Sequence, residues 1–170
     1  YKRFQHDLCG NRMIYVGESA PKFYVGSTAV SNIYVGSTPV WSSFKAMGID
    51  KSGSSSISSN TWTLLTGWVA RSGYPDTVIT SNGLEIPAGA TVTLTGQTQH
   101  GSANSGNACR IVAGGTVLAT SVSSSTATPT VSASFTPSVA TIVQLEVFAN
   151  GLTATRQISA GSNTYLVAQP

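Results

Sequence analysis

Histidine, cysteine and carboxylate side chains are scarce in this sequence, so it offers little material for acid–base or metal chemistry. There are two histidines, two cysteines and six acidic residues among 170. His6, Asp7 and Cys9 lie close together, but their spacing matches no common zinc site. His100 lies in a polar run, QTQHGSANSGN, where we expect an exposed and solvated side chain. We expect no metal site.

Enzymatic motifs are also missing. The sequence contains no nucleophile elbow, Walker loop or dinucleotide fingerprint. No two adjacent predicted strands bring together the carboxylate pair that glycoside hydrolysis requires. Cys9 and Cys109 are too few for a disulfide framework, and whether they pair stays open. Cys109 falls in an alternating apolar run, which favours a small buried side chain. We therefore expect no enzyme activity and no cofactor.

Ligand binding is a stronger possibility, because three predicted loops are long and polar: 71–76, 99–107 and 123–129. Loops at one end of a β-sandwich often carry recognition sites. The candidate binding residues are an aromatic ring on which a sugar could stack and three side chains that could hydrogen-bond its hydroxyls, namely Tyr74, His100, Asn104 and Asn107. The alternative is that these loops are solvated turns on a structural domain.

Composition and charge exclude two further classes of partner. Only 9% of residues are charged, and the net charge is +3. Six of the nine basic residues precede residue 52, but they are too scattered for the clustered stripe that binds nucleic acid. No run approaches the ~20 apolar residues of a membrane span. We expect contact with neither nucleic acid nor membrane.

Beyond residue 60 the pattern is that of β-strands. Three dipeptides, Asn82-Gly83, Gly114-Gly115 and Asn150-Gly151, supply the positive φ angles of tight hairpins. The runs between them alternate apolar and polar residues, which indicates strands with one solvated face. The predicted strands are 62–69, 77–80, 83–87, 90–98, 108–113, 116–122, 130–135, 140–149, 152–158 and 163–168.

This number of short strands predicts an all-β, antiparallel jelly-roll sandwich. An immunoglobulin-like sandwich is the alternative, but it would usually have fewer strands and, in antibody-type domains, a Cys-Trp-Cys core. Trp62 and Trp68 are six residues apart in one predicted strand, so we expect them to share a face. Core packing is the expected role of both, rather than a platform for carbohydrate.

Residues 52–60, SGSSSISSN, divide the chain, because a stretch of Ser and Gly is typical of a flexible linker. The predicted organisation is an N-terminal segment over 1–51, the linker over 52–60, and the jelly roll over 61–170.

The N-terminal segment repeats one short phrase: IYVGES from Ile14, FYVGST from Phe23 and IYVGST from Ile33. A period of nine and then ten residues is too short for a solenoid coil. It predicts a strand and a turn per unit, and a three-stranded meander that is marginal alone. Large side chains on both faces indicate that another chain covers at least one face. The candidate docking residues are Tyr15, Tyr24, Tyr34 and Trp41.

The second part of the chain resembles a known jelly roll. The runs GLEIPAGATVTLTGQTQ, RIVAGGTVLATS, ATIVQLEVFANG and NTYLVAQP, within residues 62–170, are similar to the complement globular-head and tumour-necrosis-factor-like fold. The resemblance implies a homotrimer. Aromatic residues that usually lie beside the first turn are largely threonine here, so the trimer core does not transfer residue by residue.

The repeat, which ends in PVW at Pro39 to Trp41, is similar to the opening of minor tail proteins of actinobacteria-infecting siphophages. This resemblance implies a structural protein of the phage virion, assembled in the host cytoplasm, at the tail tip or on a fibre. Its repeat would dock onto other virion proteins, and its jelly roll would project and could contact a host cell-wall glycan. The alternatives are a capsid decoration protein and a secreted carbohydrate-binding module. The polar opening YKRFQHD contains no secretory signal, which disfavours the module.

Overall fold

The computed structural model describes residues 23–25, 27–30, 32–35, 38–42, 44–122, 126–151, 153 and 156–170. These residues form strands and loops and no helix, which confirms the predicted all-β class. The chain divides after Phe44 into two compact units, 1–44 and 45–170. Each unit is described separately below.

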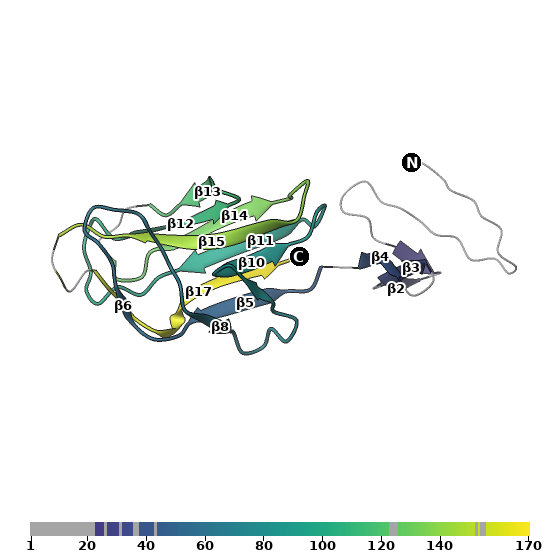
Figure 1. Ribbon diagram of the computed structural model, residues 1–170, viewed down its shortest axis with the longest axis horizontal. Coiled ribbons are helices and arrows are strands. Elements are labelled where there is room, and N and C mark those ends of the chain that lie inside the picture. Colours follow the sequence, from purple (N-terminus) through teal and green to yellow (C-terminus); the bar gives the residue numbers. More distant parts are fainter. Residues whose placement is uncertain are drawn as a thin grey trace, which may run out of the picture. The chain divides into compact units, whose positions relative to one another are not determined.

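The second unit is a sandwich of two antiparallel sheets, with long strands running along it (Figure 1). The first sheet has the order β14 (Thr130–Phe135), β11 (Val92–Gln97), β17 (Gly161–Gln169), β5 (Met47–Lys51) and β8 (Trp68–Ala70). The second has the order β13 (Thr116–Thr120), β12 (Ala108–Ala113), β15 (Thr141–Phe148), β10 (Gly83–Ile86) and β9 (Ile79–Thr80), with β7 (Thr63–Leu64) also on β15. A small sheet pairs β6 (Ser55–Ser56) with β16 (Gln157–Ile158).

The core lies between the two large sheets and follows the alternation of the sequence. In β15, Val143, Leu145 and Val147 are fully buried, while Gln144 and Glu146 between them are half-buried. Across the core, Gly96 of β11 lies against Leu145, because a Cβ atom there would be 2.5 Å from the leucine Cδ1. Other fully buried core residues are Ile49, Leu84, Leu94, Ile111 and Leu166.

Two of the three predicted hairpins exist. Gly114 and Gly115 have φ of 54° and 84° and join β12 to β13, as expected. The hairpin predicted at Asn82-Gly83 is shifted by one residue. Ser81 and Asn82 have the positive φ angles, and Gly83 pairs with Thr80 inside the ladder. The hairpin predicted at Asn150-Gly151 is wrong, because the strands on either side of it do not pair with each other. β16 pairs with β6, whereas β15 pairs with β7, β10 and β12.

The predicted strand 62–69 is broken into β7 and β8, which belong to different sheets. Gly67 between them has φ of 72°, a left-handed conformation that glycine adopts readily and that interrupts the extended strand. Trp68 is buried and its indole N–H donates to the Leu65 carbonyl at 3.0 Å, whereas Trp62 is half-buried. The expectation that the two tryptophans share a face is therefore wrong.

The boundary between the units precedes the predicted one. Residues 47–51, assigned to the N-terminal segment, form β5, which pairs with β17 and β8 inside the first sheet. Residues 52–60 do not form a free linker, because they contain β6 and the buried Ile57, whose amide donates to the Arg156 carbonyl at 3.0 Å. The Ser-rich composition concealed these contacts, since backbone pairing does not depend on side-chain type.

The described residues of the first unit form two hairpins, each a separate two-stranded sheet. β1 (Phe23–Val25) pairs with β2 (Thr28–Val30), and β3 (Asn32–Val35) pairs with β4 (Thr38–Ser42). The predicted meander of one strand per repeat is therefore wrong for these two repeats. Only two residues separate Val25 from Thr28 and Val35 from Thr38, so the chain pairs with itself at once. The first repeat, with Tyr15, lies outside the described residues.

Candidate functional site

Two of the predicted binding residues in the 98–107 loop are buried parts of its framework. His100 is 1% exposed, and its amide donates to the Ala127 carbonyl at 2.7 Å. Its Nε2 lies 3.3 Å from the Thr98 hydroxyl. The expectation of a solvated histidine is wrong, because the loop folds back against residues 126–129 and 157–159 and encloses the ring.

Asn107 is 0% exposed, and its Nδ2 donates to the carbonyls of Ser102 and Thr126, each at 2.9 Å. It thus ties two loops together and cannot contact a ligand directly. Asn104 is half-buried, and its Oδ1 accepts the Gly106 amide at 2.8 Å. Of the three predicted residues in this loop, Asn104 is the one with solvent-accessible side-chain surface.

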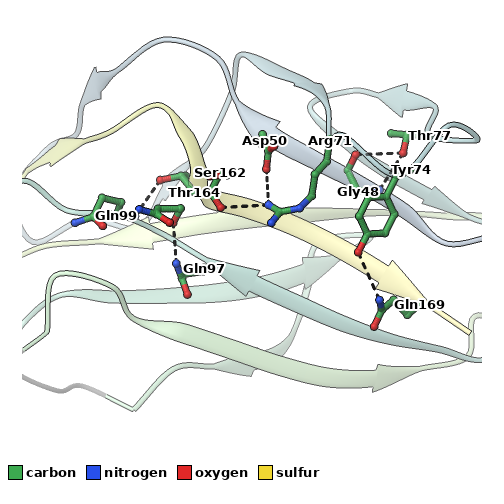
Figure 2. Close-up of polar contacts among 11 residues, drawn as sticks. Gly48, Asp50, Arg71, Tyr74, Thr77, Gln97, Gln99, Ser162, Thr164 and Gln169 are labelled. Atoms are coloured by element: carbon green, nitrogen blue, oxygen red, sulfur yellow. Dashed lines mark hydrogen bonds and ion pairs between the residues drawn. The ribbon is translucent and has the colours of Figure 1, made fainter.

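Tyr74 lies at the other end of β17 from this loop. The ring packs on the backbone of Gly48, where a Cβ atom would lie 3.0 Å from its Cγ and Cδ2. Its hydroxyl accepts a hydrogen bond from Gln169 Nε2 at 3.5 Å, near the end of β17 (Figure 2). The 98–107 loop instead contacts β17 at Thr164, whose hydroxyl accepts the backbone N–H of Gln99 at 2.9 Å. Five residues of strand span roughly 17 Å. The four predicted residues do not form one site.

Residues 71–77 form a segment that is fixed along β5. The Arg71 amide donates to the Gly48 carbonyl at 2.8 Å. The Thr77 hydroxyl accepts the Gly48 amide at 2.9 Å and donates to its carbonyl at 3.1 Å (Figure 2). One hydroxyl therefore satisfies both backbone groups of a strand residue, as a neighbouring strand would.

Arg71 connects this segment to the face of the first sheet. Its Nη1 donates to Asp50 Oδ1 at 2.5 Å and to the Ser162 carbonyl at 3.2 Å (Figure 2). Its guanidinium also lies 4.4 Å from the centre of the Tyr165 ring. Because the ion pair is partly buried, its hydrogen bonds and cation–π contact hold the segment more firmly than an exposed pair would.

The outer surface of β14, β11 and β17 carries uncharged side chains, most of them serine and threonine, and we call it the polar face. Paired residues point to the same side of a sheet, so three rows can be followed across the strands. The rows are Thr130, Gln97 and Tyr165; Ser132, Thr95 and Val167; and Ser134, Thr93 and Gln169. Val167 is 6% exposed in the centre, and Thr130 donates to Gln97 Oε1 at 3.1 Å.

A second cluster lies on the outer surface of the other sheet. The Arg110 guanidinium lies 4.3 Å from the centre of the Trp62 ring and binds Glu146 Oε2 at 2.6 Å. The Phe148 ring lies 5.3 Å from Trp62 and is tilted by 42°. Trp62 is therefore enclosed by neighbours on this surface rather than in the core, a location that sequence spacing alone did not predict.

Reactive groups within the described residues are few. Cys109 is a buried thiol, and burial raises its pKa to about 12, despite hydrogen bonds with Ser121 and Thr98 that lower it. Burial also lowers the pKa of Lys51, whose Nζ donates to the Gly53 carbonyl at 2.9 Å. No cluster of three metal-ligating side chains occurs in the described part of the chain, and His6, Asp7 and Cys9 lie outside it.

The predicted docking residues are only partly covered by the structure. Tyr24 lies in β1, Tyr34 in β3 and Trp41 in β4. Within the described ranges, no helix has the length and apolar character needed to cross a membrane.

Comparison with known proteins supports the fold alone. No protein-family profile matches the chain, and no curated protein matches it either. Among solved structures, the sandwich is similar to the Eiger tumour necrosis factor of S. frugiperda, with a TM-score of 0.56 and 11% sequence identity. The match covers 74% of this chain and 90% of the other. The C-terminal unit therefore has the tumour-necrosis-factor-like jelly-roll fold that the sequence predicted.

Proposed function

We propose that this protein is a structural component of a phage virion, a minor tail or fibre protein whose jelly roll projects from the particle and acts by binding rather than catalysis. The observation that carries the proposal is the division of the chain into a repeat unit of small hairpins and a tumour-necrosis-factor-like sandwich. Two-stranded sheets are marginal alone, which favours an attachment role for the repeats.

We further propose that the sandwich assembles as a homotrimer through the polar face. Most of its side chains are serines and threonines, which lose little rotamer entropy when they pack, and none of the side chains in its three rows is charged. The Arg71–Asp50 pair lies at the border of this face, where Arg71 covers the Tyr165 ring, and the Arg110–Glu146 pair lies on the other sheet. A host glycan would then meet the loop end near Asn104, which lies away from the start of β5.

Gold-labelled antibodies against the protein provide the test, applied to particles of the phage that encodes it. We expect label at the tail in negative-stain electron microscopy, and none after the antibodies are absorbed with purified protein. Label spread over the capsid would favour the decoration protein instead. Particles without label would overturn the proposal.

A further inference from the structure

The hairpins of the first unit leave specific backbone groups pointing away from their partner strands. In a hairpin with a two-residue loop, the pair that flanks the loop exchanges both hydrogen bonds and the next pair exchanges none. Val25 with Thr28, and Val35 with Thr38, flank the loops. The N–H and C=O groups of Tyr24 and Tyr34 therefore point outward, along the edges of β1 and β3 that face away from β2 and β4.

The opposite edge of the second hairpin is unsuited to pairing. Tyr34 is opposite Pro39, and a proline without an N–H fits this non-bonded position. The register shifts between Ile33 and Tyr34, which leaves Val40 as an extra residue in β4. Proline and a bulge both block edge pairing, so β4 is protected while β3 is not. Among the described strands, β1 and β3 have no second partner.

We propose that β3 of one copy pairs through its outer edge with β1 of a neighbouring copy. This inference rests on the proposed homotrimer, which would hold three repeat units at high effective concentration. The two edges carry nearly the same sequence, FYV and IYV, and each offers a donor and an acceptor at its tyrosine. Each junction would form a four-stranded sheet with the order β4, β3, β1 and β2, and three such sheets would close around the threefold axis.

Residue-resolved hydrogen exchange on the full chain tests this pairing, together with its mass by light scattering. The Tyr24 and Tyr34 amides point away from their own hairpins, so protection there requires another strand. We expect a trimer in which both amides exchange at least about tenfold more slowly than in an unpaired edge strand. A trimer with unprotected amides would overturn this inference alone. A monomer would overturn the trimer, and with it this inference.

Proline substitution shows which edges pair. Tyr34→Pro removes the outward N–H of β3 while sparing its own hairpin, as Pro39 does in β4. We expect it to abolish protection of the Tyr24 amide, which belongs to the other hairpin. Ala29→Pro is the matched control, because it removes the outward N–H of β2, an edge left unpaired in this arrangement. Protection at Tyr24 that survives Tyr34→Pro, or that is lost equally in the control, would refute the pairing of β3 with β1.

Discussion

At the scale of single residues, burial changes what reactive groups can do. Cys109 lies in β12 with 0% exposure, and its thiol contacts the Pro129 carbonyl at 3.2 Å. The raised pKa keeps this thiol protonated in the folded protein where an unfolded chain would already carry a thiolate. Because the thiolate is the nucleophile, Cys109 is a core residue rather than a reactive one.

The same shift predicts a pH dependence of stability. The folded thiol keeps its proton up to a pKa of about 12, against 9.0 for an ordinary thiol, so the unfolded state binds fewer protons between these values. Cys109 should stabilise fully below pH 9, and its contribution should fall by up to about 1.4 kcal/mol per pH unit above it. We expect Cys109→Ala to have a shallower decline in urea-unfolding free energy from pH 9 upward. Parallel curves for the two proteins would contradict this.

Gly83 is a second residue whose role comes from its surroundings. A Cβ atom at this position would lie 2.2 Å from the Val143 carbonyl oxygen, which the β10–β15 ladder holds in place. We expect Gly83→Ala to lower the unfolding free energy by about 1–3 kcal/mol, because backbone must move to admit the methyl group. Thermal and urea unfolding measure the loss. Glu85→Ala, at an exposed site in the same strand, should change stability little.

At the scale of elements, the 71–77 segment is an example of side chains that complete a sheet. Thr77 bonds both backbone groups of Gly48, and the Tyr74 ring covers that glycine. Tyr74 was predicted to be a sugar contact, but its ring is used for packing. The segment therefore closes the β5 end of the first sheet.

Replacing the Thr77 hydroxyl should show this contribution. Thr77→Val keeps the shape but leaves the Gly48 amide without its acceptor, so we expect a loss of about 1–3 kcal/mol in unfolding free energy. Thr77→Ser keeps the hydroxyl and should retain most of the stability. Urea unfolding of the three proteins compares them. Equal stability of the valine and serine variants would show that the hydroxyl contributes nothing.

At the scale of the whole molecule, the sandwich presents two different outer surfaces. The polar face carries Ser, Thr and Gln around Val167, whereas the other sheet carries the Trp62 cluster with its Arg110–Glu146 ion pair. The proposed trimer uses the first surface.

A charge placed on the polar face should therefore separate the subunits. Thr95 lies between Ser132 and Val167, so Thr95→Arg would bury an unpaired charge in each interface. We expect light scattering to give the monomer mass for this variant and a trimer mass for the parent. Gln144→Arg, on the outer side of β15, is the control and should remain trimeric. A trimeric Thr95→Arg protein would exclude the polar face as the interface.

The sequence by itself determined the β-class, most strand positions beyond residue 80, the Gly114-Gly115 hairpin and the buried face of β15. These features depend on local chemistry: the two-residue period of apolar side chains and the φ angles that glycine permits. The jelly-roll sandwich was predicted from the number of short strands and its tumour-necrosis-factor-like form from resemblance, and the structural comparison confirms the fold.

Only the tertiary structure decided which residues come together. His100 and Asn107 occur in a polar run, yet loops distant in sequence bury them, and Tyr74 lies at the other end of β17. The Ser-rich residues 52–60 belong to the folded unit because β16, about a hundred residues later, pairs with them. Such placements come from long-range backbone pairing and packing, which local periodicity does not encode.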